Sequence, residues 1–194
     1  MHHIHHTTGF VIGHADIKEA DRLFFLFTRE LGVIYAIAQG IRKETSRLRY
    51  SLQDFSCSRI DLVHGKEMWR ITSAKKIETE ELANNKEYTA MFARVLELVR
   101  RLCQGEEAIE PIFDTLEELV NIFEQEKNID RESLLGLEYI TVITILYELG
   151  YLAPDGVVAS YVLGDLSVEK AKEAFVDRVA LLQIITRTLG ETQL

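Results

Sequence analysis

The sequence predicts an α+β protein, in which a small β-barrel over residues 1–78 is followed by an all-α helical bundle over residues 79–194. Five short apolar segments with glycines between them fill the first part, and the spacing of apolar residues changes from strand-like to helix-like after Ile77. Formal charge divides at the same place. Residues 1–78 carry 12 Lys or Arg against 9 Asp or Glu, whereas residues 79–194 carry 10 against 22. We therefore expect two modules with different partners.

The strands of the barrel are expected where β-branched and aromatic residues gather. They cover Thr8–Gly13, Arg22–Thr28, Val33–Ala38, Gln53–Val63 and Met68–Lys75, and a polar connection over Ala15–Asp21 joins the first two. Gly32, Gly40 and Gly65 lie between strands, where turns need the conformational freedom of glycine. Five strands at this spacing favour a closed or nearly closed barrel.

The helices of the bundle are expected where apolar residues recur at three- and four-residue steps. They cover residues 80–103, 109–123 and 131–149, and a last helix begins after Ser167 and reaches Leu189. Asp130 and Ser167 are suited to cap the last two helices. The helix over residues 131–149 is apolar almost all round, which predicts a central, buried position. The apolar segment Val157–Leu163 fits either a strand or a packed loop.

Composition argues against several classes of protein. Two cysteines, Cys57 and Cys103, are too few for a disulfide scaffold or for a zinc site built on CxxC pairs, so we expect core thiols in a reducing cytosol. No apolar run approaches the roughly 18 residues that a membrane span needs, and no secretory signal is evident. We therefore expect a cytoplasmic protein with no membrane contact.

Enzyme motifs are scarce, since the sequence lacks the GxGxxG, P-loop, HExxH and GxSxG patterns. His14 near Asp16 is interpreted as a pair of surface residues, and the glutamates of residues 117–126 as a solvated helix face. The histidines within the first six residues have no Asp, Glu or Cys nearby to complete a metal site. We expect no catalytic residue, no metal and no other cofactor.

The basic segment Ile41–Arg49 is the most informative functional feature, because it holds four cations in a chain of net charge −9. Cationic loops beside exposed aromatic rings are typical of barrels that bind single-stranded nucleic acid. The interleaved rings are Tyr35, Tyr50, Phe55 and Trp69, of which the last two also suit a core. The candidate phosphate-binding residues are Arg22, Arg29, Arg42, Lys43, Arg47, Arg49, Lys66 and Arg70. The alternative interpretation is an ordinary solvated loop.

Several short blocks of sequence follow one another along the first part of the chain. They are Gly9–Gly13, Glu19–Leu23, Leu26–Gly32, Ala38–Lys43, Ser46–Arg49 and Leu52–Phe55. In order and spacing they resemble the N-terminal domain of the RecO family of bacterial recombination mediators, and Leu146–Tyr151 is similar to a later element of that family.

This resemblance implies an OB-fold followed by a helical domain. It also implies a non-enzymatic DNA-repair protein that binds single- and double-stranded DNA and anneals complementary strands. With RecR, such proteins help RecA replace single-strand-binding protein on DNA. A protein of this kind is expected on the nucleoid, within the cytoplasm.

The chain departs from the family in two ways. Many members carry zinc-binding CxxC pairs after the element that Leu146–Tyr151 resembles, whereas residues 153–160 contain no cysteine, so no zinc is expected. The chain is also short for the family, which predicts a trimmed helical domain. The family is described as docking the acidic tail of single-strand-binding protein on that domain. Arg94, Arg100 and Arg101 are the cations that could meet it here.

The residues leave a further interpretation open, because the positive balance of the barrel is small. In this alternative the protein is an interaction adaptor of the repair or replication machinery that does not bind DNA. Basic residues in a continuous groove would favour DNA binding, whereas their neutralisation by Glu44 and Asp54 would favour the adaptor.

Overall fold

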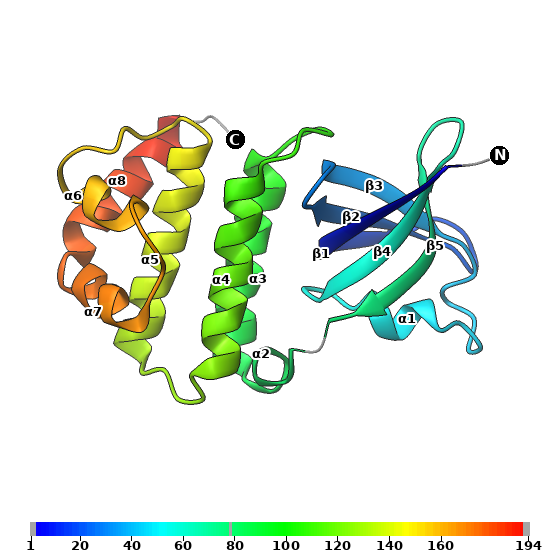
Figure 1. Ribbon diagram of the computed structural model, residues 1–194, viewed down its shortest axis with the longest axis horizontal. Coiled ribbons are helices and arrows are strands. Elements are labelled where there is room, and N and C mark those ends of the chain that lie inside the picture. Colours follow the sequence, from blue (N-terminus) through cyan, green and yellow to red (C-terminus); the bar gives the residue numbers. More distant parts are fainter. Residues whose placement is uncertain (1–2, 78, 192–194) are drawn as a thin grey trace. The chain divides into compact units, whose positions relative to one another are not determined.

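The computed structural model describes residues 3–77 and 79–191 and falls into two compact units (Figure 1). The first unit comprises the chain up to Thr79 together with Val99–Glu110. The second comprises Glu80–Leu98 and the chain from Pro111 onward. The domain boundary expected between residues 78 and 79 stays a prediction. The compact units are interleaved, since residues 99–110 group with the barrel.

The first unit is a β-barrel, which confirms the predicted fold class. Within the described residues its strands are β1 (Ile4–Asp16), β2 (Arg22–Thr28), β3 (Gly32–Ala38), β4 (Cys57–His64) and β5 (Trp69–Lys76), and a short helix α1 (Leu48–Ser51) joins β3 to β4. They close in the order β1-β2-β3-β5-β4. Only the β3–β5 pairing is parallel, and it is short, with Ala36 opposite Trp69 and Ile37 opposite Arg70. A closed five-stranded barrel of this kind is an OB-fold.

The basic segment is attached to the barrel core at its start and just beyond its end. The core contains the buried residues Val11, Phe24, Leu26, Ile34, Ala36, Ala38, Ile41, Leu52, Ile60, Leu62, Trp69 and Ile71. Ile41 opens the basic segment and Leu52 follows α1, and their exposed fractions are only 2% and 3%. Burial of two branched side chains at these positions contributes about 1.5–3 kcal/mol each and fixes the path of the chain between them.

Strand β1 is longer than the predicted Thr8–Gly13, because it has two partners. Its first half pairs with β4, where Ile4 lies opposite Val63, and its second half pairs with β2, where Asp16 lies opposite Arg22. The expected polar connection over Ala15–Asp21 therefore loses its first two residues to the strand. Backbone hydrogen bonds from neighbouring strands override the polar composition of this segment.

The second unit is helical, as predicted. Its elements are α2 (Glu80–Asn84), α4 (Glu110–Gln125), α5 (Arg131–Glu148), α6 (Gly156–Val162), α7 (Val168–Val176) and α8 (Arg178–Glu191), with α3 (Lys86–Leu102) shared between the two units. Asp130 and Ser167 cap α5 and α7 through side-chain oxygens, as expected. In the described ranges, no helix combines the length and apolarity needed to cross a bilayer.

Three segments of the helical unit differ from the prediction. The helix expected over residues 80–103 is interrupted at Asn85, whose side-chain oxygen accepts hydrogen bonds from the backbone N–H groups of Glu87 and Tyr88 and so starts α3. The last helix is interrupted at Asp177, whose carboxylate accepts a hydrogen bond of 2.8 Å from the Tyr161 hydroxyl. The strand and loop interpretations of Val157–Leu163 are both wrong, since this segment is α6, with Val158 and Tyr161 buried one turn apart.

Both cysteines are buried and neither forms a disulfide, which confirms the expectation of core thiols. Burial raises the pKa of the Cys103 thiol to about 11. A thiol of this kind stays protonated at neutral pH and is a poor nucleophile. Cys103 therefore gives no support to a catalytic or redox function.

Candidate nucleic-acid interface

The basic segment and the β1–β2 loop meet at one end of the barrel, because of the strand register. Arg22 begins β2 and lies opposite Ala38, the last residue of β3, so the segment that leaves β3 passes the start of β2. Two hydrogen bonds from backbone N–H groups join the two loops. The N–H of Gly40 donates to the Asp21 side-chain carboxylate at 2.8 Å, and the N–H of Arg42 donates to the Ala20 carbonyl at 3.1 Å. The position of the basic segment is therefore set by the barrel.

Three predicted cations surround one pocket at this end. Arg22, Arg42 and Arg49 line it together with Ile41 and Leu52, and its volume is about 260 Å³. Arg22 lies 27 positions before Arg49 in the sequence, so the barrel and not local sequence brings them together. A concave, cationic site on an apolar floor favours binding of an anion such as a phosphate group.

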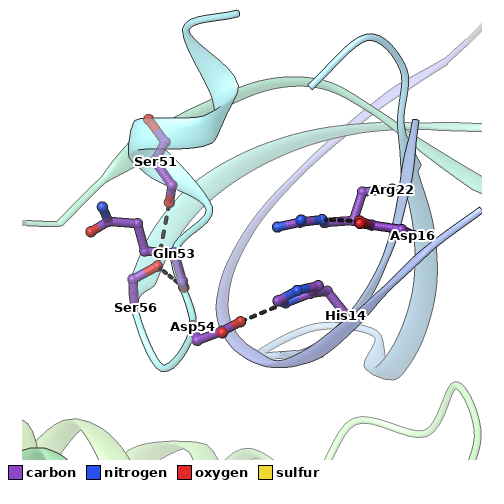
Figure 2. A network of polar contacts seen from close by, with 7 residues as sticks. All are labelled: His14, Asp16, Arg22, Ser51, Gln53, Asp54 and Ser56. Atoms are coloured by element: carbon purple, nitrogen blue, oxygen red, sulfur yellow. Dashed lines mark hydrogen bonds and ion pairs between the residues drawn. The ribbon is translucent and has the colours of Figure 1, made fainter. Parts of the chain in front are cut away.

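Asp16 pairs with two of these arginines, and Figure 2 shows its contact with Arg22. The Nε of Arg22 donates to one carboxylate oxygen of Asp16 at 2.7 Å, and the Nε of Arg42 lies 3.5 Å from the other oxygen. The Nη1 of Arg42 also donates to the Lys18 carbonyl at 3.2 Å. Sequence reasoning missed this role of Asp16. Its separation of six residues from Arg22, across a short strand connection, was the available signal.

The pKa of the Asp16 carboxyl lies below its ordinary value of 3.8, chiefly because the hydrogen bond from Arg22 stabilises the charged form. The pair therefore stabilises the fold above that value, and its contribution is lost as the pH falls through the lowered pKa. We expect an NMR titration to give a midpoint for Asp16 below 3.8, and Arg22→Gln to raise it. Arg47→Gln, on the basic segment but outside the pocket, serves as the control. A wild-type midpoint at or above 3.8 would contradict the pairing.

Neither Glu44 nor Asp54 neutralises the basic segment. Asp54 pairs instead with His14, whose Nδ1 lies 2.7 Å from the Asp54 carboxylate (Figure 2). Glu44 forms no ion pair within the described residues. The Ser56 hydroxyl donates to the Gln53 carbonyl at 2.7 Å and holds the turn after α1. The only carboxylate that the described ion pairs place on the basic segment is therefore Asp16.

The other predicted cations do not line the pocket. Lys43 and Arg47 are exposed on the basic segment, Lys66 lies in the β4–β5 turn, and Arg70 lies on β5 beside Ile37, close to the end of β3. Arg29 follows the last residue of β2, whereas Arg22 is the first. At about 3.4 Å per residue, this separates the two by more than 20 Å. The structure does not bring Arg29 together with the pocket.

The exposed aromatic side chains are fewer than the sequence suggested. Tyr35 is 53% exposed on the outer surface of β3 and meets Phe25 of β2 edge to face, at 5.2 Å between ring centroids. Tyr50 is 61% exposed, with the guanidinium of Arg49 over its ring at 5.0 Å. Trp69 is a core residue, and its indole N–H donates to the Glu106 carboxylate at 3.0 Å. Tyr35 and Tyr50 are thus the candidates for base stacking.

Residues 1–79 match the sequence model of a protein family described as "Recombination protein O N terminal". This segment belongs to the RecO family. The resemblance seen in the sequence is therefore confirmed, and the RecO match covers the whole barrel with its basic segment and pocket.

Curated relatives extend the similarity into the helices. The chain is 31% identical over 125 residues to the DNA repair protein RecO of Dehalococcoides mccartyi, which covers 62% of this chain and 49% of the relative. It is 28% identical over 130 residues to RecO of Alkaliphilus metalliredigens, covering 66% and 52%. Over 61 residues it is 48% identical to RecO of Heliobacterium modesticaldum, covering 31% and 22%. The chain thus spans about half, or less, of the length of these RecO proteins.

The three arginines of the helices that were predicted to meet an acidic tail are less available for this contact than expected. Arg94 forms two hydrogen bonds to the Glu138 carboxylate, at 2.6 and 2.5 Å, and this pairing raises the pKa of Arg94. Its charge is therefore neutralised locally. Arg100 and Arg101 also have interaction partners. Docking of an acidic tail near these residues stays a prediction.

The metal-binding capacity of the described part of the chain is small. Residues 3–77 and 79–191 contain no group of three or more His, Cys, Asp or Glu side chains suited to hold a metal ion. Residues 153–160, where the family resemblance led us to look for zinc-binding cysteines, include part of α6 and contain none. A RecO function without zinc stays an expectation.

Proposed function

We propose that this chain is a RecO-type recombination mediator that acts in DNA repair. The observation that carries this proposal is the gathering of Arg22, Arg42 and Arg49 at one pocket of a RecO-family barrel. Lys43 and Arg47 extend the cationic surface along the basic segment, and Tyr35 and Tyr50 offer rings to unstacked bases. Single- and double-stranded DNA are the proposed ligands.

Neutralisation of phosphate charge is the proposed physical basis of activity. Two complementary strands repel one another, and each phosphate paired with Arg or Lys lowers that repulsion. Strands held side by side on the barrel would then anneal. No covalent bond is made or broken, so the proposed activity needs neither a catalytic residue nor a cofactor such as zinc.

The helical unit is proposed to contact proteins. Residues 79–194 carry 12 more acidic than basic side chains, which disfavours contact with DNA. We assign to the complete mediator an association with RecR and with single-strand-binding protein, and through them the loading of RecA. The site of action would be the nucleoid, within the cytoplasm.

A salt series tests DNA binding directly. Fluorescence anisotropy of labelled single-stranded DNA, titrated with the wild-type chain between about 50 and 200 mM salt, is expected to show binding that weakens steeply as salt rises. An annealing assay with complementary strands is then run at a salt concentration at which half of the labelled DNA is bound. Absence of binding at the lowest salt would contradict the proposal.

The second candidate function is an interaction adaptor without DNA binding. The pairing of Asp16 with both Arg22 and Arg42 favours it, because one carboxylate offsets part of the cationic charge. If the anisotropy titration shows no binding, pull-downs with RecR and single-strand-binding protein test the adaptor. Retention of either protein without DNA binding would establish it.

A further inference from the structure

The pocket formed by Arg22, Ile41, Arg42, Arg49 and Leu52 is a small depression that is half-open to solvent. Its floor consists of the buried side chains of Ile41 and Leu52. Its volume of about 260 Å³ lies below the roughly 300–1,000 Å³ of pockets for drug-sized ligands. A small anionic group fits these dimensions.

The three guanidinium groups retain hydrogen-bond donors for such a group. Among the described residues, Arg22 uses Nε for Asp16, Arg42 uses Nη1 for Lys18 and directs Nε toward Asp16, and Arg49 uses Nη2 for the Tyr50 hydroxyl at 3.0 Å. Each guanidinium carries five N–H donors, so most of them stay available. Because Asp16 holds Arg22 and Arg42 from one side, their remaining donors are already oriented before a ligand arrives.

The charge of the site distinguishes between two kinds of phosphate. Three arginines and one aspartate leave a formal charge of about two positive units. A phosphodiester within a DNA strand carries one negative charge, whereas a phosphate monoester carries about −1.5 to −2 at pH 7 and offers three terminal oxygens. A monoester therefore matches both the charge and the number of arginines.

We propose that this pocket is a receptor for a phosphate monoester at the phosphorylated end of a DNA strand. The inference rests on the proposed function, since it assigns a particular part of DNA to the same surface. The backbone would follow the exposed Lys43 and Arg47, while the terminal phosphate enters between Arg22, Arg42 and Arg49.

The test compares single-stranded oligonucleotides that differ only at one end. One pair carries a 5′-phosphate or a 5′-hydroxyl with the label at the 3′ end, and a second pair exchanges the two ends. We expect one phosphorylated strand to bind about tenfold more tightly than its hydroxyl counterpart. Arg49→Gln should abolish this ratio. Lys43→Gln, in the same segment but outside the pocket, should weaken both strands and leave the ratio unchanged. The fluorescence of Trp69 checks that each variant keeps its barrel.

The outcomes separate the inference from the function on which it rests. Equal, salt-dependent binding of phosphorylated and hydroxyl strands would overturn the end receptor and leave DNA binding intact. Absence of binding by every strand at low salt would overturn both. Inorganic phosphate presents a similar anionic group that is not attached to a DNA strand. Its displacement of both strands alike, at constant ionic strength, would assign the pocket to free phosphate and overturn the end receptor.

Discussion

Replacing Arg42, Lys43, Arg47 and Arg49 together with alanine is expected to weaken binding of single-stranded DNA by roughly a hundredfold at 150 mM salt. Each lost phosphate contact lowers the slope of log affinity against log salt by about 0.7 for single strands, so the slope should become about three units shallower. The loss should be alike for all sequences, because phosphate contacts carry no sequence information. Anisotropy titrations of both proteins across the salt series measure the two quantities.

The matched control removes the same charge elsewhere. Lys86, Lys127, Arg131 and Lys172 are exposed on the helical unit, and their joint replacement by alanine also lowers the net charge of −9 by four. This control should bind DNA with a nearly unchanged slope of log affinity against log salt. An equal loss in both variants would show that net charge, and not the basic segment, governs binding. An unchanged slope in the first variant would remove the basic segment from the interface.

Gly136→Ala is expected to destabilise the helical unit by about 3 kcal/mol or more, the range of severe overpacking. Gly136 lies in the middle of α5, where a Cβ atom would come 1.9 Å from the carbonyl oxygen of Ala171 in α7. A backbone atom cannot move aside as a flexible side chain can. The two helices would have to separate, and the fully buried Ala171 and Ala174 of α7 would lose contacts.

Gly190→Ala supplies the control for this substitution. Gly190 lies near the end of α8, and nothing lies within 4 Å of the Cβ position. Alanine there should be neutral, or should stabilise by up to about 1 kcal/mol through helix propensity. Urea unfolding followed by circular dichroism at 222 nm reports the helices, while Trp69, the single tryptophan, reports the barrel. Equal stability of Gly136→Ala and the wild type would contradict the close helix packing.

Much of the fold follows from local signals. The spacing of apolar residues changes near Ile77, and this change predicted a barrel followed by helices. Residues on one face of a strand recur at every second position, whereas those on one face of a helix recur at three- and four-residue steps. Asp130 and Ser167 were recognisable as caps, since capping depends on a side chain and the backbone a few residues away. The RecO resemblance also came from residues near one another in sequence.

The interruptions at Asn85 and Asp177 were missed, although polar residues stand at both places. Asn85 uses its side chain to begin a helix, which a pattern of apolar spacing does not register. Asp177 receives the hydroxyl of Tyr161, a residue 16 positions earlier. Apolar periodicity continues through both breaks, so the predicted helices were too long.

The sequence by itself determined which residues carry the positive charge, and that they belong to a small barrel with acidic helices after it. Only the tertiary structure decided which of them act together. The register of β2 against β3 places Arg22 beside the basic segment and leaves Arg29 at the far end of the strand. The antiparallel pairing of β1 with β2 adds Asp16 to the arginines. Such contacts depend on which strands pair and in which register, and these choices are made by burial of the whole core.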